Sequence, residues 1–177
     1  MFYLKLSREN VEEYIENILD LYISVYSAPP RNEIINREEI REEIYNGFYK
    51  QSISIMAIDN GIVVGLSSAM PAIYLKDFKE MSKKSLSLKE NENAYFHTEA
   101  YVAEDYRGKK VGSSLFNIRK TLILNETNEN KIFTRTRQDA IAQNNLLKKE
   151  NFKKIASLEI ETNNVISIKD IWEYSIS

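Results

Sequence analysis

The residues best placed to do chemistry lie in the stretch AEDYRGKKVGSSL, residues 103–115, which holds Gly108 and Gly112, two of the five glycines of the chain. A strand-like apolar segment precedes this stretch and a helical pattern follows it. A strand that ends in a glycine turn and opens a helix presents backbone N–H groups at the positive end of the helix dipole. The sequence therefore predicts a phosphate site, although a simple strand-to-helix turn with a solvated basic rim would look the same. The basic residues of the stretch are Arg107, Lys109 and Lys110.

Two well-known phosphate loops do not fit these residues. A Walker A loop has four residues between its glycines and then Lys followed by Ser or Thr. Here Gly108 and Gly112 enclose three residues, and Ser113 and Ser114 follow. A dinucleotide-binding G-x-G-x-x-G motif needs three glycines, and the stretch has two.

The longer segment EAYVAEDYRGKKVGSSLFNIRK, residues 99–120, resembles the cofactor motif of the GNAT (Gcn5-related) N-acetyltransferase superfamily. That motif reads Gln/Arg-x-x-Gly-x-Gly/Ala after the fourth strand, and Arg107, Lys110 and Gly112 occupy its defining positions. Lys110 replaces the first Gly, which keeps the amide but narrows the allowed backbone angles. The segments DNGIVVGLSSA (59–69) and NNLLKKENF (144–152) are also similar to family segments.

This resemblance implies the GNAT fold and direct transfer of the acetyl group of acetyl-CoA, the cosubstrate, to an amine without a covalent enzyme intermediate. It also implies which residues hold acetyl-CoA. The backbone of Tyr101 and Val102 would pair with the pantetheine arm, and Asn144 would contact the cosubstrate, with Asn145 as the alternative. The backbone amides expected to bind the pyrophosphate are those of Arg107, Gly108, Lys109, Lys110, Val111, Gly112 and Ser113.

The strand before the loop supplies the candidate catalytic residues. Alternation along YFHTEAYV places Tyr95, His97, Glu99 and Tyr101 on one face. Many family members carry a base on this strand, so we expect Glu99 to remove the proton of the amine; the alternative is a Glu that bonds a neighbouring helix or a basic residue. His97, the only histidine, is a candidate for substrate binding or a hydrogen-bonded core residue.

The residue at the position of the family's general acid differs from the family pattern. Leu147 stands where the pattern Leu-Tyr-x-Lys-x-Gly-Phe has Tyr, and it cannot donate a proton. Tyr101 is then the nearest hydroxyl candidate by strand face, and solvent is the alternative. Asn151 replaces the Gly of that pattern, a tolerable change because Asn also adopts left-handed backbone angles.

The acceptor is expected to bind between the first two helices, where Tyr26 and Arg31 are the candidate contacts and Glu33 and Tyr45 could also reach it. The helices are rich in acidic residues, which favours a cationic acceptor such as a polyamine or an aminoglycoside. The alternative is that these acidic residues simply lie on two solvent-exposed helix faces and bind no acceptor. These acidic residues are Glu12, Glu13, Glu16, Glu38, Glu39, Glu42 and Glu43.

Composition removes many other classes of site. The chain has 177 residues, no cysteine and one histidine, so it has no thiolate nucleophile or disulfide, and we expect no metal site. With a net charge of −2 and no long apolar run, nothing in the overall composition indicates nucleic acid or a membrane as a partner. A nucleic-acid-binding domain that uses the basic loop with Arg119 and Lys120 is a weak alternative at this net charge. We expect one domain over residues 1–177 and a cytoplasmic location.

The patterns that position these residues predict an α/β fold, α+β by stricter usage, with a central mixed, mostly antiparallel sheet flanked by helices. The order strand, loop, helix, strand over residues 94–137 implies a parallel pair with a right-handed crossover. Ser7 is expected to cap the first helix, and an Asn60-Gly61 turn to join a hairpin. Predicted strands lie at 2–7, 52–59, 62–70, 94–102, 131–137, 152–161 and 166–176; helices lie at 11–25, 36–47, 111–124 and 139–150, with a short helix and loop within 73–92.

We therefore expect an N-acetyltransferase for a small-molecule amine. The alternatives are a protein or peptide acetyltransferase of the same fold, and a regulatory module that binds acyl-CoA without catalysis. A homodimer is possible through edges of the C-terminal strands, which would turn around Asn163-Asn164.

Overall fold

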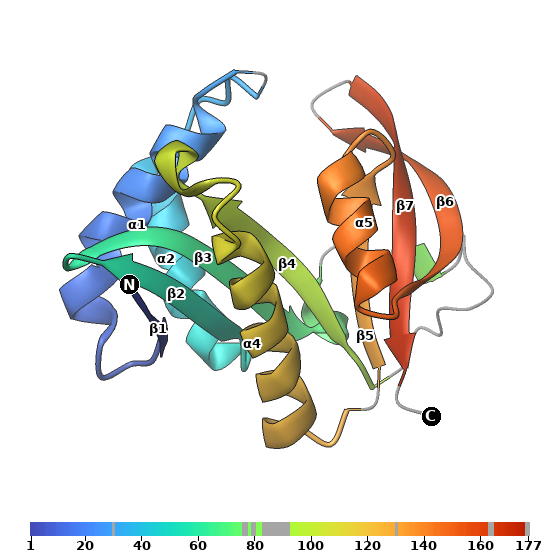
Figure 1. The fold of residues 1–177 in the computed structure, drawn as a ribbon, viewed down its shortest axis with the longest axis horizontal. Coiled ribbons are helices and arrows are strands. Elements are labelled where there is room, and N and C mark those ends of the chain that lie inside the picture. The colour runs from blue at the N-terminus through green and yellow to red at the C-terminus, as the bar shows by residue number, and fades with distance from the viewer. Residues whose placement is uncertain are drawn as a thin grey trace. The chain divides into compact units, whose positions relative to one another are not determined.

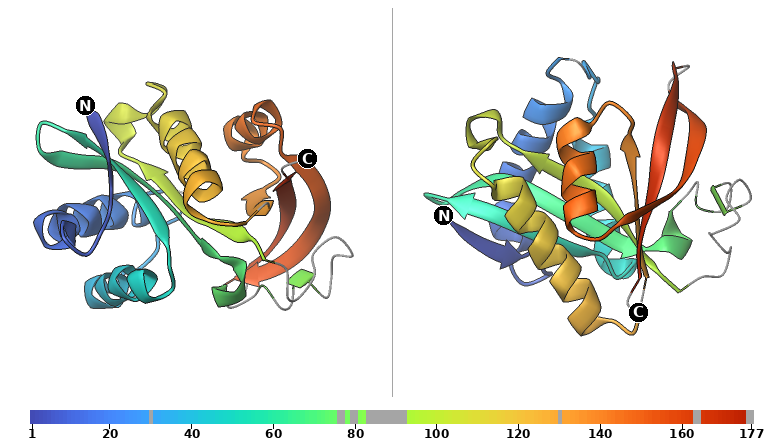
Figure 2. Two further views of the ribbon diagram at one scale, coloured as in Figure 1. Left: turned by 90° about the horizontal axis from the view of Figure 1, so that it is seen from below. Right: turned by 45° about the vertical axis from the view of Figure 1, so that its right-hand side comes forward.

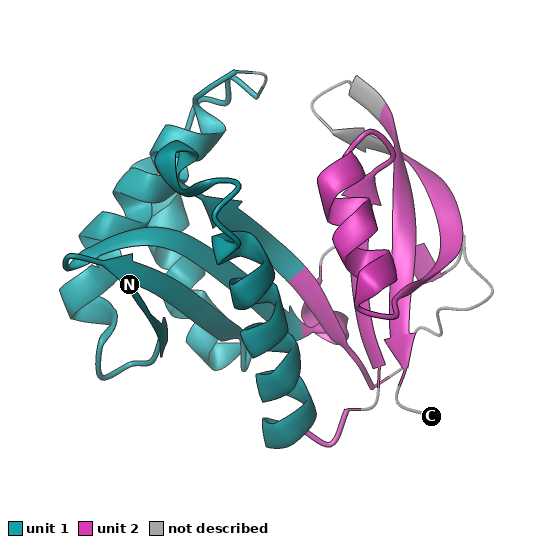
Figure 3. Ribbon diagram, viewed as in Figure 1, with its two compact units in different colours: residues 1–70, 98–126 teal, residues 71–97, 127–177 magenta. Residues whose placement is uncertain are grey.

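The computed structural model describes residues 1–29, 31–75, 78, 81–82, 93–129, 131–162 and 165–175. The chain forms two compact units, one of residues 1–70 and 98–126 and the other of residues 71–97 and 127–177 (Figure 3). The expectation of one domain stays a prediction. The hydrogen-bonded strand order is β1-β2-β3-β4-β5-β7-β6, so strand β4 (Tyr95–Val102) contributes to both units. The expected α/β fold with a mostly antiparallel seven-stranded sheet is confirmed.

The first unit is built on antiparallel strands that helices cover on both faces. Helices α1 and α2 lie on one face of these strands and α4 lies on the other (Figures 1 and 2). The hairpin of β2 and β3 turns at Asn60 and Gly61, whose φ angles are +50° and +79°, as the Asn-Gly turn predicts. Its elements are β1 (Phe2–Lys5), α1 (Val11–Tyr26), α2 (Arg37–Tyr49), β2 (Ile53–Asp59), β3 (Ile62–Pro71), β4 and α4 (Val111–Glu126).

Helix α1 forms because its apolar residues recur at helical spacing, and Val11, Ile15 and Ile18 are buried in the core of this unit. The prediction of Ser7 as N-cap was wrong. Asn10 precedes the helix, and the Ser7 carbonyl accepts hydrogen bonds from the amides of Asn10 and Val11. The Asn10 side chain in turn accepts from the Ser7 amide at 2.9 Å, so the two residues close a turn before the helix.

Helix α2 begins as predicted, because the Asn36 side chain accepts a hydrogen bond from the Glu38 amide at 3.1 Å. Its predicted end at Gly47 was wrong, since the helix continues to Tyr49 and Gln51 takes the left-handed backbone with φ +55°. Gly47 has a packing role instead. A Cβ atom there would lie 2.7 Å from the Ser52 hydroxyl oxygen.

The second unit contains a parallel ladder that joins Tyr95–His97 of β4 to Ile132–Thr134, which confirms the predicted parallel pair. Phe96 and Phe133 are fully buried in its core. Asn151 has φ +65°, the left-handed angle expected after α5. The Asn163-Asn164 turn and most of residues 73–92 lie outside the described residues. Further elements are β5 (Lys131–Arg137), α5 (Ile141–Lys149), β6 (Lys153–Thr162) and β7 (Val165–Ser175), with short 3-10 turns at Ala72–Tyr74 and, in the first unit, Glu104–Tyr106.

Candidate functional site

The basic loop lies between β4 and α4, and its backbone opens toward the start of the helix. Gly108 has φ +73° and Lys110 has φ +65°. The Lys110 carbonyl accepts from the Ser114 amide at 3.0 Å and from the Ser113 hydroxyl at 2.8 Å, which fixes the first turn. The amides of residues 111–113 precede the first intrahelical bond, so they are the donors that a helix start leaves for an anion.

Gly65 and Gly112 both lie close to the first turn of α4, but the absence of a side chain serves a different purpose at each position. At Gly65 in β3, a Cβ atom would lie 2.9 Å from Leu115 Cδ1 and 3.4 Å from Val111 Cγ1, so this glycine lets α4 approach the sheet. At Gly112 a Cβ atom would meet Val102 Cγ2 alone, at an ordinary 3.7 Å. Packing within the protein does not require a glycine at position 112, and glycine in a helix costs about 1 kcal/mol relative to alanine. Close approach of a ligand to this backbone would explain a small residue here, Gly or Ala as in the motif.

The cationic side chains of the loop are partly engaged by the protein. Arg107 turns back so that its Nε donates to the Val102 carbonyl at 3.3 Å. The Lys109 ammonium lies 5.3 Å from the centre of the Tyr106 ring, and the Tyr106 hydroxyl donates to Asp59 at 2.8 Å. The backbone amides therefore stay the predicted donors for a phosphate group.

A surface pocket of about 250 Å³ lies beside this loop. It brings together Tyr101, Val102 and Arg107, three of the predicted acetyl-CoA contacts. Arg31, a predicted acceptor contact, also lines it, and its guanidinium carbon lies 3.9 Å from the centre of the Tyr26 ring. The full lining is Val25, Pro29, Arg31, Ala100, Tyr101, Val102 and Arg107.

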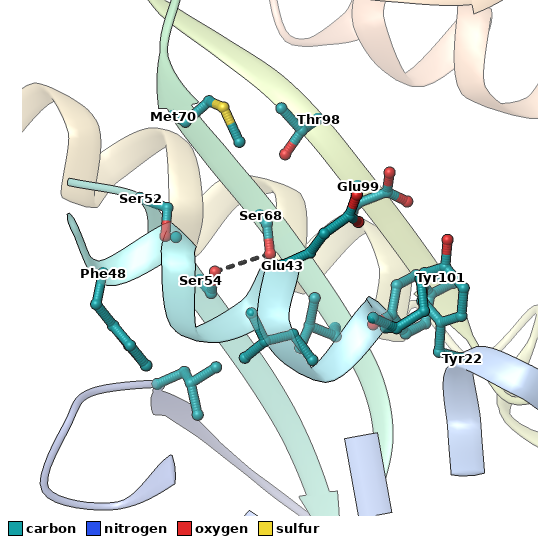
Figure 4. A pocket seen from close by; sticks show the side chains of 15 residues that line it. Tyr22, Glu43, Phe48, Ser52, Ser54, Ser68, Met70, Thr98, Glu99 and Tyr101 are labelled. Carbon is teal, nitrogen blue, oxygen red and sulfur yellow. Dashed lines mark hydrogen bonds between the residues drawn. The ribbon is translucent and has the colours of Figure 1, made fainter. Parts of the chain in front are cut away.

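A second pocket, of about 150 Å³, lies between α1, α2 and strands β2 to β4; we name it the acceptor pocket (Figure 4). Most of its lining is apolar, with the carboxylates of Glu43 and Glu99 and a group of hydroxyls as the polar exceptions. The side chain of Tyr101 lines this pocket too. The remaining lining residues are Leu6, Tyr22, Ile40, Ile44, Gly47, Phe48, Ser52, Ser54, Leu66, Ser68, Met70 and Thr98.

Glu99 is held from two sides. The Tyr26 hydroxyl donates to Glu99 Oε2, and the guanidinium of Arg119 on α4 donates to the Glu99 backbone carbonyl at 2.8 Å. Thr98 and Glu99 both line the acceptor pocket, so the simple alternation expected along β4 does not hold here.

Three tyrosines surround this carboxylate. The rings of Tyr22 and Tyr26 stack with centroids 4.2 Å apart, and Tyr101 meets both edge-on at 5.5 and 5.9 Å. Burial raises the pKa of Tyr101 well above its usual value, and the negative charge of Glu99 raises it further. The same two causes raise the pKa values of Tyr22 and Tyr26. All three hydroxyls therefore remain protonated at neutral pH.

No protein-family model matches the chain, and the comparison by sequence finds no similar curated protein. Solved structures do resemble it. The ribosomal-protein-alanine N-acetyltransferase from Brucella melitensis has a TM-score of 0.75 at 13% identity, with 99% of this chain and 100% of that chain covered. An N-acetyltransferase from Staphylococcus aureus Mu50 has a TM-score of 0.71 at 14% identity, with 99% of each chain covered. Arabidopsis thaliana NAA60 in complex with acetyl-CoA has a TM-score of 0.68 at 12% identity, with coverages of 99% and 98%.

This chain has the GNAT fold. Within the GNAT fold, three residues predicted from the sequence lie in the second unit. His97 is buried, with its ring centre 5.8 Å from that of Phe152. Asn144 donates to the carbonyls of Arg137 and Gln138 at 3.2 and 3.1 Å, and Leu147 is fully buried in the core. Roles for His97 and Asn144 in binding stay predictions.

The acidic helix residues of this GNAT fold are distributed differently from the expected rim. Glu16 pairs with Arg37 and Arg41, each at 2.6 Å. Glu12 accepts a hydrogen bond from Tyr45 at 2.7 Å. Glu33 lies 3.9 Å from Arg31. Of the seven acidic residues in the sequence-based rim, Glu43 is the one that lines the acceptor pocket.

Sequence reasoning missed two residues of the site. Glu43 was one of several similar acidic residues on a helix, and no local signal distinguishes it. Arg119 entered the sequence analysis as part of a weak nucleic-acid alternative, and the structure shows it buried instead, at 2% exposed on α4. Among the described residues, no group of three side chains could hold a metal ion, and no helix is long and apolar enough to cross a membrane.

Proposed function

We propose that this protein is an acetyl-CoA-dependent N-acetyltransferase that acts on the amine of a small molecule. The observation that supports it best is the position of Tyr101, which lines both the pocket beside the basic loop and the acceptor pocket. A thioester at the end of a pantetheine arm that runs from the loop along Tyr101, and an amine held in the acceptor pocket, would therefore meet next to Tyr101 and Glu99. Holding two reactants in this way supplies much of the rate enhancement of a group transfer.

The residues present fit acetyl-CoA. The amides of residues 111–113 would bind its pyrophosphate, and Gly112 leaves the backbone open to it. The backbone of Tyr101 and Val102 would pair with the pantetheine arm beside Arg107. Acetyl-CoA, when bound, supplies an acetyl thioester that an amine can attack. Relatives of the fold support this assignment, because NAA60 was solved in complex with acetyl-CoA.

Glu99 would act as the general base. An aliphatic amine is protonated at neutral pH and must lose a proton before it attacks. Glu99 lines the acceptor pocket, where the Tyr26 hydroxyl donates to its Oε2, so its carboxylate is placed to take the proton there. Tyr101 would then act as the general acid, because its hydroxyl is protonated at neutral pH and it lines both pockets, where the leaving thiolate would form.

A peptide or protein acceptor is the second candidate. The Brucella melitensis neighbour is named for a ribosomal protein, and the NatC complex was solved with a Gag peptide and CoA. A regulatory module that binds acyl-CoA without catalysis is the third. A cytoplasmic location and a homodimer are proposals as well, and the strand order leaves β6 at an edge for pairing.

Two experiments distinguish these candidate functions. The first is calorimetric titration with acetyl-CoA, CoA and a DNA duplex, and the second is an assay of thiol release with amines. We expect binding of both CoA species, no binding of DNA, and thiol release that depends on the amine. Binding without transfer to any amine or peptide would indicate the regulatory module. Absence of binding by either CoA species would contradict the proposed function.

A further inference from the structure

The size of the acceptor pocket restricts what can react. Its volume is about 150 Å³, and its walls are mainly aliphatic and aromatic side chains. An apolar cavity of about 150 Å³ accommodates a molecule of the size of benzene. The part of the acceptor that enters is therefore limited to about six to eight non-hydrogen atoms, far fewer than an aminoglycoside contains.

The charges of the pocket lie toward one end. Glu43 and Glu99 both lie close enough to Tyr22 to raise its pKa, and Figure 4 shows them on the side of the tyrosines. Phe48 and Ser52 lie at the opposite end of the view. Among the described residues, no carboxylate lines that end, so a second ammonium group there would lie against apolar side chains without a counter-charge in the lining, which is unfavourable.

The two carboxylates differ in exposure. Both line the pocket, but Glu43 is exposed whereas Glu99 is half-buried. An amine arrives as an ammonium ion. Glu43 is placed to attract that ion and to neutralise it while Glu99 takes its proton, and an exposed carboxylate can do so without a large desolvation cost.

On the basis of the proposed function, we propose that the acceptor is a small primary monoamine with an uncharged stem, and that Glu43 selects its positive charge. The stem fills the apolar pocket toward Phe48. This narrows the expected polyamine or aminoglycoside to an amine with a single charge at the reacting end.

Steady-state kinetics at saturating acetyl-CoA test this proposal, with butylamine, benzylamine, 1,4-diaminobutane and a heptapeptide with a free N-terminus as acceptors. We expect kcat/KM for the two monoamines to exceed the others by about 10-fold or more. Glu43→Gln should raise KM for butylamine by about 5- to 10-fold with little change in kcat. The matched control is Glu42→Gln, an exposed neighbour on α2 outside the pocket lining, which should change neither constant.

The outcomes separate the inference from the proposed function. A preference for 1,4-diaminobutane or for the peptide, or equal behaviour of the Glu43 and Glu42 variants, would overturn the monoamine proposal while leaving an N-acetyltransferase. Failure to acetylate any of the four acceptors would count against the proposed function itself.

A second inference concerns Arg119, and it rests on a different observation. Arg119 is 2% exposed, and its Nη1 donates to the Ser68 carbonyl at 2.7 Å and to the Glu99 carbonyl at 2.8 Å. Its Nε has no hydrogen-bond partner among the described residues. A buried guanidinium between two backbone carbonyls is costly, so stability alone is a poor explanation for it.

We infer that Arg119 is a positioning residue for Glu99. It ties the backbone of Glu99 in β4 to that of Ser68 in β3, and its positive charge favours the carboxylate form of Glu99. The groups around Glu99 in the first unit are Tyr22 and Tyr26 on α1, Glu43 on α2, Tyr101 on β4 and Arg119 on α4, and the charges of Arg31 and Glu33 act on the neighbouring tyrosines.

The variants Arg119→Gln and Arg119→Lys test this inference. For Arg119→Gln we expect a kcat about 10-fold lower or more, acetyl-CoA affinity close to that of the unchanged protein, and an acid limb of kcat/KM shifted upward by about 0.5 to 1 pH unit. Arg119→Lys keeps the charge, so it should keep the acid limb and recover part of the rate.

A folded Arg119→Gln variant with the kcat and pH profile of the unchanged protein would overturn the positioning role. A loss confined to acetyl-CoA affinity would do so as well. If Arg119→Gln does not fold, Arg119→Lys decides the question: a lower kcat with unchanged acetyl-CoA affinity supports the role, and an unchanged kcat contradicts it.

Discussion

At the scale of single residues, Glu99 carries the proposed proton transfer. Glu99→Gln removes the base but keeps the shape and a hydrogen-bond partner for Tyr26. We expect kcat to fall by about 100-fold or more, because the ammonium ion can no longer be deprotonated inside the pocket. Acetyl-CoA affinity should remain within about 2-fold, since the binding amides lie on the loop and α4. Equal activity of the variant would show that another group is the base.

Tyr26 affects the pH range in which Glu99 can act as a base. Its hydroxyl donates to the Glu99 carboxylate, and such a bond favours the charged form of the acid. Without it, Glu99 binds its proton more tightly, so the base is lost at a higher pH. Tyr26→Phe should therefore move the acid limb of kcat/KM upward by about 0.5 to 1 pH unit. A pH profile that superimposes on that of the unchanged protein would show that this hydrogen bond does not tune the base.

Lys110 tests the strain in the loop. Its φ of +65° lies in the left-handed region, where a side chain costs about 1 kcal/mol relative to glycine. Lys110→Gly relieves this backbone strain, so it should raise the melting temperature, or leave it unchanged if the greater entropy of the unfolded glycine chain offsets the gain. Acetyl-CoA binding should be preserved, because the backbone amide is kept. The matched control is Lys109→Gly, whose φ is not positive, so it gains no relief and should be the less stable variant. The reverse order of stability would contradict this reasoning.

At the scale of elements, two glycine substitutions test two features of α4 separately. One is its contact with β3, and the other is its N-terminus. Gly65→Ala places a Cβ atom 2.9 Å from Leu115 Cδ1, so it should lower the melting temperature. Gly112→Ala meets ordinary space and gains helix propensity, so it should keep or raise the melting temperature. Acetyl-CoA affinity should stay within about 2-fold, because the motif that Gly112 matches accepts Gly or Ala at this position and the backbone amide is kept.

Thermal unfolding and calorimetric titration of the two variants check this pair. A Gly112→Ala variant that loses most of its acetyl-CoA affinity would contradict the assignment of Gly112 to a motif position that accepts alanine. A Gly65→Ala variant with unchanged stability would show that α4 can shift on the sheet without cost.

The elements themselves were predictable where the signal is local. The Asn60-Gly61 turn, the Asn36 cap and the left-handed Asn151 follow from the backbone preferences of those residues, and the structure confirms each of them. The end of α2 was missed because Gly47 was interpreted as a stop signal. It is instead a packing glycine beside Ser52, a contact that depends on how the chain returns to the sheet.

At the scale of the whole molecule, the basic loop could be found in the sequence because all its parts are contiguous. The acceptor pocket could not, since α1, α2 and three strands contribute to it. Arg119 shows the same limit. It lies on the face of α4 that packs on β3 and β4, and a charged residue at such a position is recognisable as buried only from the tertiary fold.

Direct acetyl transfer to a small amine can be tested in one measurement: mass spectrometry of the products formed from acetyl-CoA with a ¹³C-labelled acetyl group and butylamine. We expect labelled N-acetylbutylamine and free CoA in equal amounts, with the product abolished in Glu99→Gln. Labelled acetate in place of the acetylated amine, or no release of CoA while acetyl-CoA binds, would contradict the proposed function.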